Sequence, residues 1–343
     1  SLSTMRHASF SVALLLLLLE QLTIVVVSFT QQSSVCGCER RRLAASRSSS
    51  SSSLSLDELV SRKLREADAL QQKHASIAES DVRRRLSFAS TQGGVRFGRA
   101  LRRESDSAKQ VAVVADLKRQ HLTGESVGAS FREAGMVAET MMAWPVDAVS
   151  VGLESFGGSA DELRAARRAL GPSAPLLAKE LVVDPIQIAL AAESGADAVL
   201  LMAPLVGNRL EDLLEVATVV GVEAVVEVHT PNECRFALAA GATIILANNY
   251  DRIDRQLVPG QALGLKELIP PNVLALASGG IDDLAHATAL ANAGYDALFL
   301  GTSIVARPPA DSKPFVHAVR NDLKVSPLQS MFSSLSNAFP TDD

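Results

Sequence analysis

The chain has 343 residues and a formal net charge of -5, and 47% of its residues are hydrophobic while only 4% are aromatic. This charge argues against a nucleic-acid-binding surface, because phosphate backbones are bound by clustered lysine and arginine. The length fits one α/β domain of about 250 residues preceded by a leader, and the aliphatic composition is typical of parallel-sheet proteins.

Residues 1–55 predict a removable leader in two parts. Two short apolar runs, 12–19 and 23–27, are separated by Glu20, so a secretory signal is favoured over a membrane anchor. The following stretch, 38–56, is rich in arginine and serine and almost free of acidic residues, which is typical of a transit peptide. Two cysteines fall in this leader and one on a predicted helix, so neither a disulfide framework nor a zinc site is expected.

A signal segment followed by a transit-like segment resembles the bipartite leaders of algae with complex plastids. Phe29, just after the apolar runs, resembles the aromatic residue found at their cleavage point. We therefore expect delivery to the plastid stroma (the chloroplast interior), with no membrane segment in the mature protein. A plain secreted protein is the alternative, and it leaves the serine and arginine tract unexplained.

Residues 56–109 predict a helical extension ahead of the main domain. The stretch 56–86 is charged and helix-prone, with Leu59, Leu64 and Leu70 loosely periodic, and a second short helix is expected around 97–103. We expect these helices to cap the domain that follows.

Residues 110–343 predict an α/β fold of the (β/α)8 or TIM-barrel class. Short apolar runs alternate there with amphipathic stretches, as in βα units with a parallel sheet. Eight strands are expected, at 111–117, 148–151, 175–178, 198–202, 224–228, 243–247, 273–277 and 297–300. Helices are expected between them, among others at 161–170, 185–194, 209–220, 231–239 and 283–293. A doubly wound sheet is the competing architecture, but no Gly-x-Gly-x-x-Gly motif follows the first strand.

Polar residues close several of the predicted strands, where the active site of such a barrel lies. A lone charge there is more often a strand meeting water, but four strand ends converging on one mouth favour an active site. These residues are Asp116 and Lys118, Lys179 and Glu180, Glu227 and His229, and Asn248 and Asn249.

The last two strand ends predict a phosphate site. Ser278-Gly279-Gly280 follows the seventh strand and Gly301-Thr302-Ser303 follows the eighth. Glycine lets backbone N–H groups approach a phosphate closely. A tight turn explains Ser-Gly-Gly alone equally well, and its pairing with the second motif favours phosphate binding.

Distinctive motifs occur at residues 179–188 (KELVVDPIQI), 195–202, 226–229 and 248–249, and at Phe156-Gly157-Gly158-Ser159. Through these motifs the segment 97–306 resembles the indole-3-glycerol-phosphate synthase family of tryptophan biosynthesis. It implies a carbon–carbon lyase that closes the indole ring of a carboxyphenylamino-deoxyribulose phosphate with loss of carbon dioxide and water. The residues form no metal-ligand cluster and this chemistry needs no cofactor, so none is expected.

The resemblance also implies roles for the matched residues. Lys179 would be the general acid and Glu227 the base, a pair that suits acid–base chemistry in a dry barrel mouth. Lys118 would hold the substrate carboxylate and Asn248 would orient the sugar hydroxyls. Asp116 stands where the family has a catalytic Glu. Ser278, Gly279, Gly280, Gly301 and Thr302 would contact the substrate and seat its phosphate.

Several positions depart from the family pattern. His121-Leu122-Thr123 replaces Ser-Pro-Ser, Tyr250 replaces Arg, and Ser278 replaces an active-site Glu. Three readings stay open: a working, divergent synthase, which we favour; a related lyase or isomerase acting on another phosphorylated substrate; and a non-catalytic barrel kept as a plastid scaffold or regulatory protein. The expected partners are a small phosphorylated substrate and other enzymes of the tryptophan pathway.

Overall fold

The computed structural model describes residues 55–75, 96–102, 111–122, 124–128, 134–251 and 256–323. The chain divides into two units, Ser1–Ser52 and Ser53–Asp343, and every described residue belongs to the second. The predicted leader therefore lies outside the described residues, apart from Ser55, and so does the part of the first predicted helix beyond residue 75.

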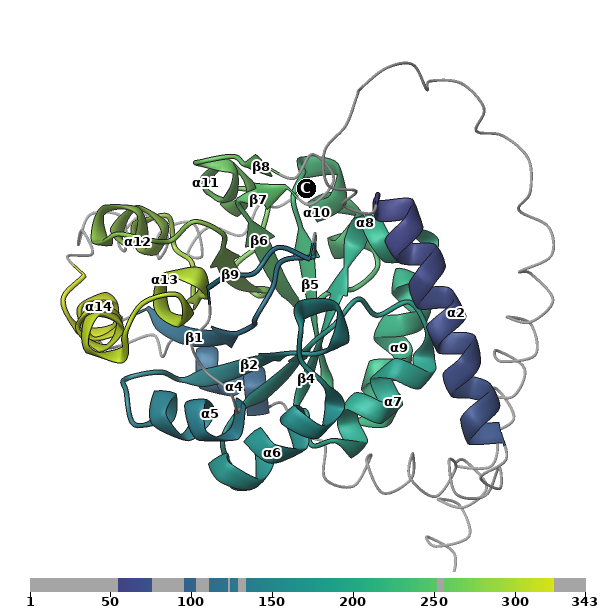
Figure 1. Cartoon of the computed structure of the whole chain (residues 1–343). Coiled ribbons are helices and arrows are strands. Elements are labelled where there is room, and N and C mark those ends of the chain that lie inside the picture. Colours follow the sequence, from purple (N-terminus) through teal and green to yellow (C-terminus); the bar gives the residue numbers. More distant parts are fainter. Residues whose placement is uncertain are drawn as a thin grey trace, which may run out of the picture. The chain divides into compact units, whose positions relative to one another are not determined.

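Eight parallel strands close into a barrel in the order β1-β10-β9-β6-β5-β4-β3-β2 (Figure 1). The predicted barrel is confirmed, with each predicted strand end within one residue of the observed one. The strands read as continuous apolar runs because both of their faces are covered. They are β1 (Ala112–Leu117), β2 (Ala148–Gly152), β3 (Leu176–Lys179), β4 (Ala198–Met202), β5 (Glu223–Val228), β6 (Ile244–Asn248), β9 (Leu274–Ser278) and β10 (Ala297–Leu300).

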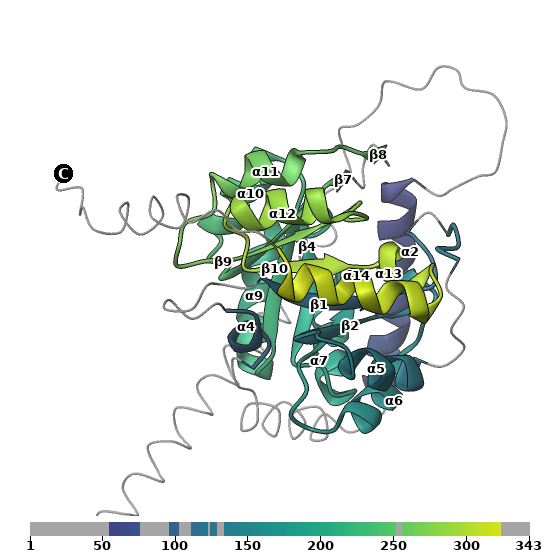
Figure 2. The ribbon, with the colours of Figure 1, turned by 90° about the vertical axis from the view of Figure 1, so that its left-hand side faces the viewer.

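Helices surround the barrel, and Figure 2 shows α12 and α14 on the side of β1 and β10. The longer ones are α5 (Ala134–Met142), α6 (Ala160–Leu170), α7 (Pro185–Glu193), α9 (Leu210–Val220), α10 (Pro231–Ala239), α11 (Gln261–Lys266), α12 (Leu284–Asn292) and α14 (Pro309–Asn321). Short elements at the strand ends are η1 (Glu154–Phe156), α8 (Ala203–Val206), η2 (Gly207–Arg209), α13 (Thr302–Val305) and a hairpin of β7 (Tyr250–Asp251) and β8 (Gln256–Leu257).

Local sequence signals set where these helices begin and end. The side chain of Asp184 accepts the N–H of Ile186, and Gln187 reaches back to the N–H of Asp184, so the two residues form a capping box ahead of Pro185. At the other end of such a helix, Gly221 is left-handed with φ 84° and stops α9.

Alternation along each strand separates the barrel interior from the layer beneath the helices. Val114, Leu177, Leu246 and Leu276 belong to an apolar cluster inside the barrel, while their sequence neighbours pack outward with the helices. Because side chains repeat every second residue, the next inward positions toward the carboxyl ends are polar. They are Asp116, Lys179, Asn248 and Ser278, joined by Glu227 of β5.

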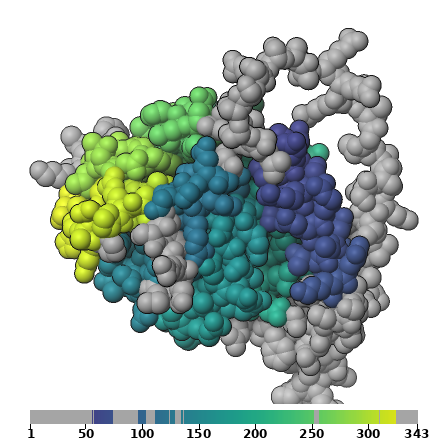
Figure 3. All heavy atoms as spheres, in the orientation of Figure 1, coloured from purple at the N-terminus to yellow at the C-terminus, as the bar shows by residue number. Residues whose placement is uncertain are grey.

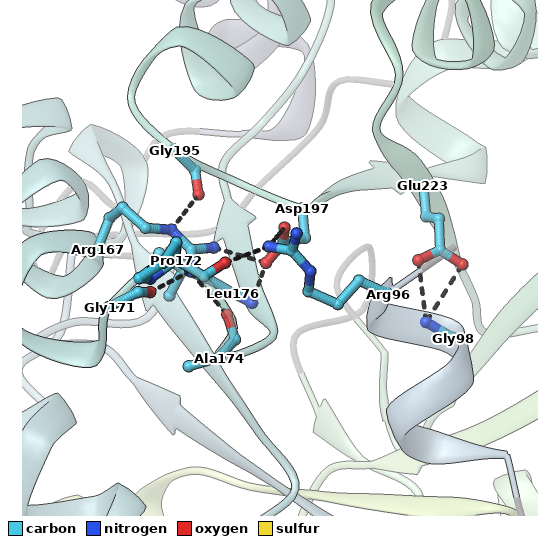
Figure 4. A network of polar contacts seen from close by, with 10 residues as sticks. All are labelled: Arg96, Gly98, Arg167, Gly171, Pro172, Ala174, Leu176, Gly195, Asp197 and Glu223. Atoms are coloured by element: carbon cyan, nitrogen blue, oxygen red, sulfur yellow. Dashed lines mark hydrogen bonds and ion pairs between the residues drawn. The ribbon is translucent and has the colours of Figure 1, made fainter. Parts of the chain in front are cut away.

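The shorter of the two N-terminal helices closes the amino end of the barrel. Phe97 and Leu101 of α4 (Arg96–Leu101) belong to the interior cluster and close the amino ends of the strands. Arg96 Nη1 reaches Asp197 Oδ1 at 3.0 Å and Glu223 accepts the N–H of Gly98 at 3.0 Å (Figure 4).

The longer helix α2 (Leu56–Ala75) contacts α7 and lies on the outside of the barrel, where its purple atoms are seen at the surface in Figure 3. Its buried Leu59 and Ala67 pack with Leu181, Val183 and Leu205, which follow β3 and β4. In the part of the chain that the structure describes, no helix has both the length and the apolar character needed to cross a bilayer.

Candidate active site

A cavity of about 230 Å³ opens at the carboxyl ends of β1, β3, β6, β9 and β10. Nine of the ten residues to which the family resemblance gives a role line it: Asp116, Lys118, Lys179, Asn248, Ser278, Gly279, Gly280, Gly301 and Thr302. The tenth, Glu227, is fully buried and is not among the lining residues. Among the described residues, no group of three or more His, Cys, Asp and Glu side chains is arranged to hold a metal ion.

An ion pair between Asp116 and Lys179 lies at the centre of this mouth. Lys179 Nζ is 2.7 Å from Asp116 Oδ2, and both residues are only 2% exposed. Ser150 donates its hydroxyl to Asp116 Oδ1 at 2.9 Å, and Lys118 Nζ is 3.9 Å from Oδ2. Burial by itself would raise the pKa of Asp116, but the attraction of the two lysines and the hydrogen bonds from Lys179 and Ser150 hold that pKa below its usual value.

Lys179 is the last residue of β3 and is restrained on two sides. Besides Asp116, its Nζ lies 5.2 Å from the ring centre of Phe156, which is fully buried. The ring and the carboxylate both attract the ammonium group and hold it in one position. A buried lysine fixed at the wall of a cavity is placed as a general acid would be.

Glu227 is connected to the cavity through Asn248. The Asn248 side-chain amide donates to Glu227 Oε1 at 3.1 Å, and its oxygen accepts the N–H of Tyr250 at 3.0 Å. Asn248 itself lines the cavity. The structure therefore brings the predicted base to the wall of the mouth, with one amide between it and the open space.

The glycines after β9 and β10 allow the backbone to come close to its neighbours. Gly279 has φ 90°, and a Cβ atom there would lie 2.5 Å from Asn248 Oδ1. A Cβ atom at Gly301 would lie 3.1 Å from Asp116 Oδ2 and 3.6 Å from Lys118 Cε. Any larger residue at Gly279 would therefore displace the amide next to Glu227.

Two departures from the family pattern meet at the rim of the cavity. The rings of His121 and Tyr250 are stacked with centres 5.9 Å apart and planes at 22°. His121 follows β1 and Tyr250 follows β6, and these strands flank β9 and β10 in the barrel. The stacked pair therefore links two loops on either side of the predicted phosphate strands. Thr123 lies outside the described residues.

Two residues that support the site are not predicted from the sequence. Ser150 was hidden inside an apolar run, although it is the register partner of Asp116 on the neighbouring strand. Lys63 of α2 is 4% exposed and lies 3.3 Å from Glu180, the residue after Lys179. The alternation of inward-facing and outward-facing residues along the strand could have indicated Ser150. Nothing in the sequence indicates which of the loops after the strands α2 contacts.

The sequence matches the family described as indole-3-glycerol phosphate synthase over residues 56–319. Relatives carrying that same name include proteins from Chlorobium phaeovibrioides (29% identical over 252 residues, 73% of this chain and 93% of that protein) and Chlorobium chlorochromatii (30% identical, 73% and 94%). The relative from Mycolicibacterium vanbaalenii is 37% identical over 205 residues, 58% of this chain and 73% of that protein. This chain therefore belongs to the indole-3-glycerol phosphate synthase family.

Proposed function

We propose that this protein closes the indole ring of a carboxyphenylamino-deoxyribulose phosphate, forms indole-3-glycerol phosphate and releases carbon dioxide and water. The observation that carries the proposal is the Lys179–Asp116 pair at 2.7 Å in the barrel mouth, with buried Glu227 joined to the same mouth through Asn248. A charged lysine and a carboxylate on separate strands supply the acid and the base that this chemistry needs.

In this proposal Lys179 protonates the substrate carbonyl oxygen as the ring carbon attacks. Asp116 keeps Lys179 charged and in place, since it accepts from both Lys179 and Ser150. Lys118 lines the same cavity and holds the substrate carboxylate until it leaves as carbon dioxide. The burial of Asp116 and Lys179 strengthens the charge interaction between them.

Glu227 then takes the proton that must leave the ring system as the double bond forms, and the new hydroxyl group departs with that proton as water. Its carboxylate is held by the amide of Asn248, which also faces the sugar part of the cavity. The phosphate lies at the glycine turns after β9 and β10, where the lining includes Gly279, Gly280, Gly301 and Thr302.

The test is complementation of a bacterium that lacks this synthase, using the chain from Leu56 onward, together with a ring-closure assay on the purified protein. We expect growth and measurable closure, with closure lost in Lys179→Ala. Ser278→Glu is the sharper variant, because Ser278 faces inward beside Asn248 and stands where the family carries a carboxylate. We expect this variant to close the ring faster. No closure by wild type, Ser278→Glu or Ser278→Glu/Tyr250→Arg, all well folded, would contradict the proposal.

We further propose that the protein works in the plastid stroma, on the basis of the signal-like and transit-like segments of residues 1–55. A fluorescent fusion of residues 1–55 is expected in the plastid, and its accumulation in the culture medium would contradict this. Association with other enzymes of the tryptophan pathway stays a prediction, which co-purification of those enzymes would test.

A further inference from the structure

A histidine lies between two carboxylates where β5 leads into α10. His229 is 1% exposed, and its Nε2 is 2.9 Å from Oε1 of Glu227. Its Nδ1 is 3.2 Å from Oε2 of Glu233, and the same oxygen accepts the backbone N–H of His229 at 2.8 Å. Both ring nitrogens of one buried imidazole therefore face carboxylate oxygens.

For both ring contacts to be hydrogen bonds, the group must hold one proton more than a neutral imidazole and two ionised carboxylates carry together. An ionised carboxylate only accepts hydrogen bonds, and a neutral imidazole donates from one nitrogen only. With both carboxylates ionised and His229 neutral, one ring nitrogen would turn its lone pair toward an anion. The contact at each nitrogen is a hydrogen bond only when a further proton is shared among Glu227, His229 and Glu233.

The ordinary acidities decide where that proton sits. An imidazole holds a proton more tightly than a carboxylate by about two pH units in water, and two flanking anions increase the difference. Glu227 has a second donor in Asn248, which also favours its ionised form. We propose that His229 is a positioning residue, held as an imidazolium between Glu227 and Glu233, that keeps the buried Glu227 ionised and ready to accept a proton. The inference rests on the proposed function in taking Glu227 as the base.

Glu233 does more here than cap a helix. Thr230 is the N-cap of α10 and its side chain accepts the N–H of Glu233 at 3.2 Å. In a capping box the glutamate would return to the N-cap N–H, but Glu233 instead reaches one residue further back, to His229. Its side chain is 16% exposed, so it places the outer negative charge of the group near the surface.

The titratable groups on the elements packed around Glu227, His229 and Glu233 must be known before a pH effect is assigned to these three residues. The strands β4 and β6 flank β5, and α8, α9 and α10 pack near it. The sequences of β4 and α8 have no titratable side chain, and β6 faces Glu227 with the neutral Asn248. The charged or titratable groups on the other packed elements are Glu211, Asp212 and Glu215 of α9, Glu233, Cys234 and Arg235 of α10, and Asp116 and Lys179 inside the barrel.

Nitrogen-15 NMR of the imidazole rings in the full chain tests the proposal directly. The sequence has six histidines, and the loss of one signal in His229→Gln identifies the ring. We expect an imidazolium at a pH of about 7.5, one unit above the ordinary histidine value. In Glu233→Gln, which keeps an acceptor oxygen but removes the charge, we expect the ring to be neutral at that pH. A neutral His229 in the wild-type protein would overturn the proposal.

Kinetics give a second and independent test. In Glu233→Gln the acidic limb of the kcat profile is expected to move to higher pH, with kcat near neutral pH about tenfold lower and KM little changed. Thr230→Ala is the matched control, because it weakens the start of the same helix and leaves the three-residue group intact. It is expected to lower the melting temperature without moving the profile. An unmoved profile in Glu233→Gln would also overturn the proposal. If wild type closes no ring, the proposed function fails while the NMR result still decides the state of His229.

Discussion

The two ends of the barrel both hold charged side chains, but they use them differently. At the amino end, Asp197 accepts from Arg167 Nη2 at 2.5 Å, from Arg96 at 3.0 Å and from the N–H of Leu176 at 2.9 Å (Figure 4). Arg167 also donates to three backbone carbonyls, each at 2.8 Å, those of Gly195, Gly171 and Ala174. This network joins α4, α6 and the loops that enter β3 and β4.

At the carboxyl end, Asp116 and Lys179 also form a close pair, at 2.7 Å, but they line a cavity with Lys118. The charged groups at the amino end thus form hydrogen bonds with backbone groups of the protein itself, whereas those at the carboxyl end line the cavity. Barrels of this class place chemistry at the carboxyl ends and stability at the amino ends. The comparison predicts that equivalent substitutions will separate turnover from folding.

The largest expected effect is at the mouth. Lys179→Met removes the proposed acid, and we expect kcat to fall by on the order of a hundredfold or more. Asp116 keeps its bond from Ser150 and has Lys118 nearby, so the protein is expected to stay folded. Ring-closure rates together with urea unfolding measure both properties. A rate within twofold of wild type would remove Lys179 from the mechanism.

Arg167→Met makes the corresponding change at the amino end. It leaves Asp197 with one cation fewer and three carbonyls without their side-chain donor, so we expect a loss of about 2 kcal/mol in the free energy of unfolding, with kcat nearly unchanged. The control is Arg168→Met, an exposed arginine on the same helix, which is expected to cost under about 0.5 kcal/mol. Equal losses from the two variants would show that the network does not stabilise the barrel.

The residues of the cavity can be predicted from the sequence more easily than those of the amino-end network, for a physical reason. An apolar strand that ends in Lys179 or Asn248 marks a polar group at a known end of a known element. Asp197 stands in the loop before β4, Arg167 in α6 and Glu223 at the first position of β5, among residues of ordinary polar composition. Their contacts depend on how the closed barrel brings α4, α6 and the amino ends of β3, β4 and β5 together. The sequence also predicts no bounds for helix α5, because its residues 134–142 have no strong polar face.

Lys63→Met sharpens the comparison with a residue near the mouth that the mechanism does not use. Lys63 is buried between Glu66 and Glu180, and Glu180 also accepts the N–H of Ser155. Removing the lysine leaves an uncompensated buried carboxylate, so we expect a loss of about 1 kcal/mol in stability and kcat within a few-fold of wild type. Arg65→Met, at an exposed position of the same helix, is the control. A hundredfold loss of kcat would show instead that α2 takes part in positioning Lys179.

The smallest expected effect concerns pH, and its sign should differ between the two ends. Burial raises the pKa of Glu223 at the amino end, opposed by the N–H groups of Gly98 and Phe97, and Asp197 raises it further. The pKa of Asp116 at the mouth is lowered instead, as described above.

A group with a raised pKa binds more protons in the folded state, so its contribution to stability is present below its unfolded pKa and is lost as pH rises through the folded one. For Glu223 that window begins near the ordinary glutamate value of about 4.3 and extends upward. The stability of wild type relative to Glu223→Gln should therefore fall as pH rises through the window, by under about 1 kcal/mol because the side chain is partly exposed.

The stability of wild type relative to Asp116→Asn should instead rise with pH. The contribution of Asp116 is present above the ordinary aspartate value and is lost as pH falls through its lowered pKa. Urea unfolding of the three proteins between about pH 3 and pH 7 measures both slopes. Slopes of the same sign would show that the two ends of the barrel treat a buried carboxylate alike, and the contrast between them would then rest on shape rather than on charge.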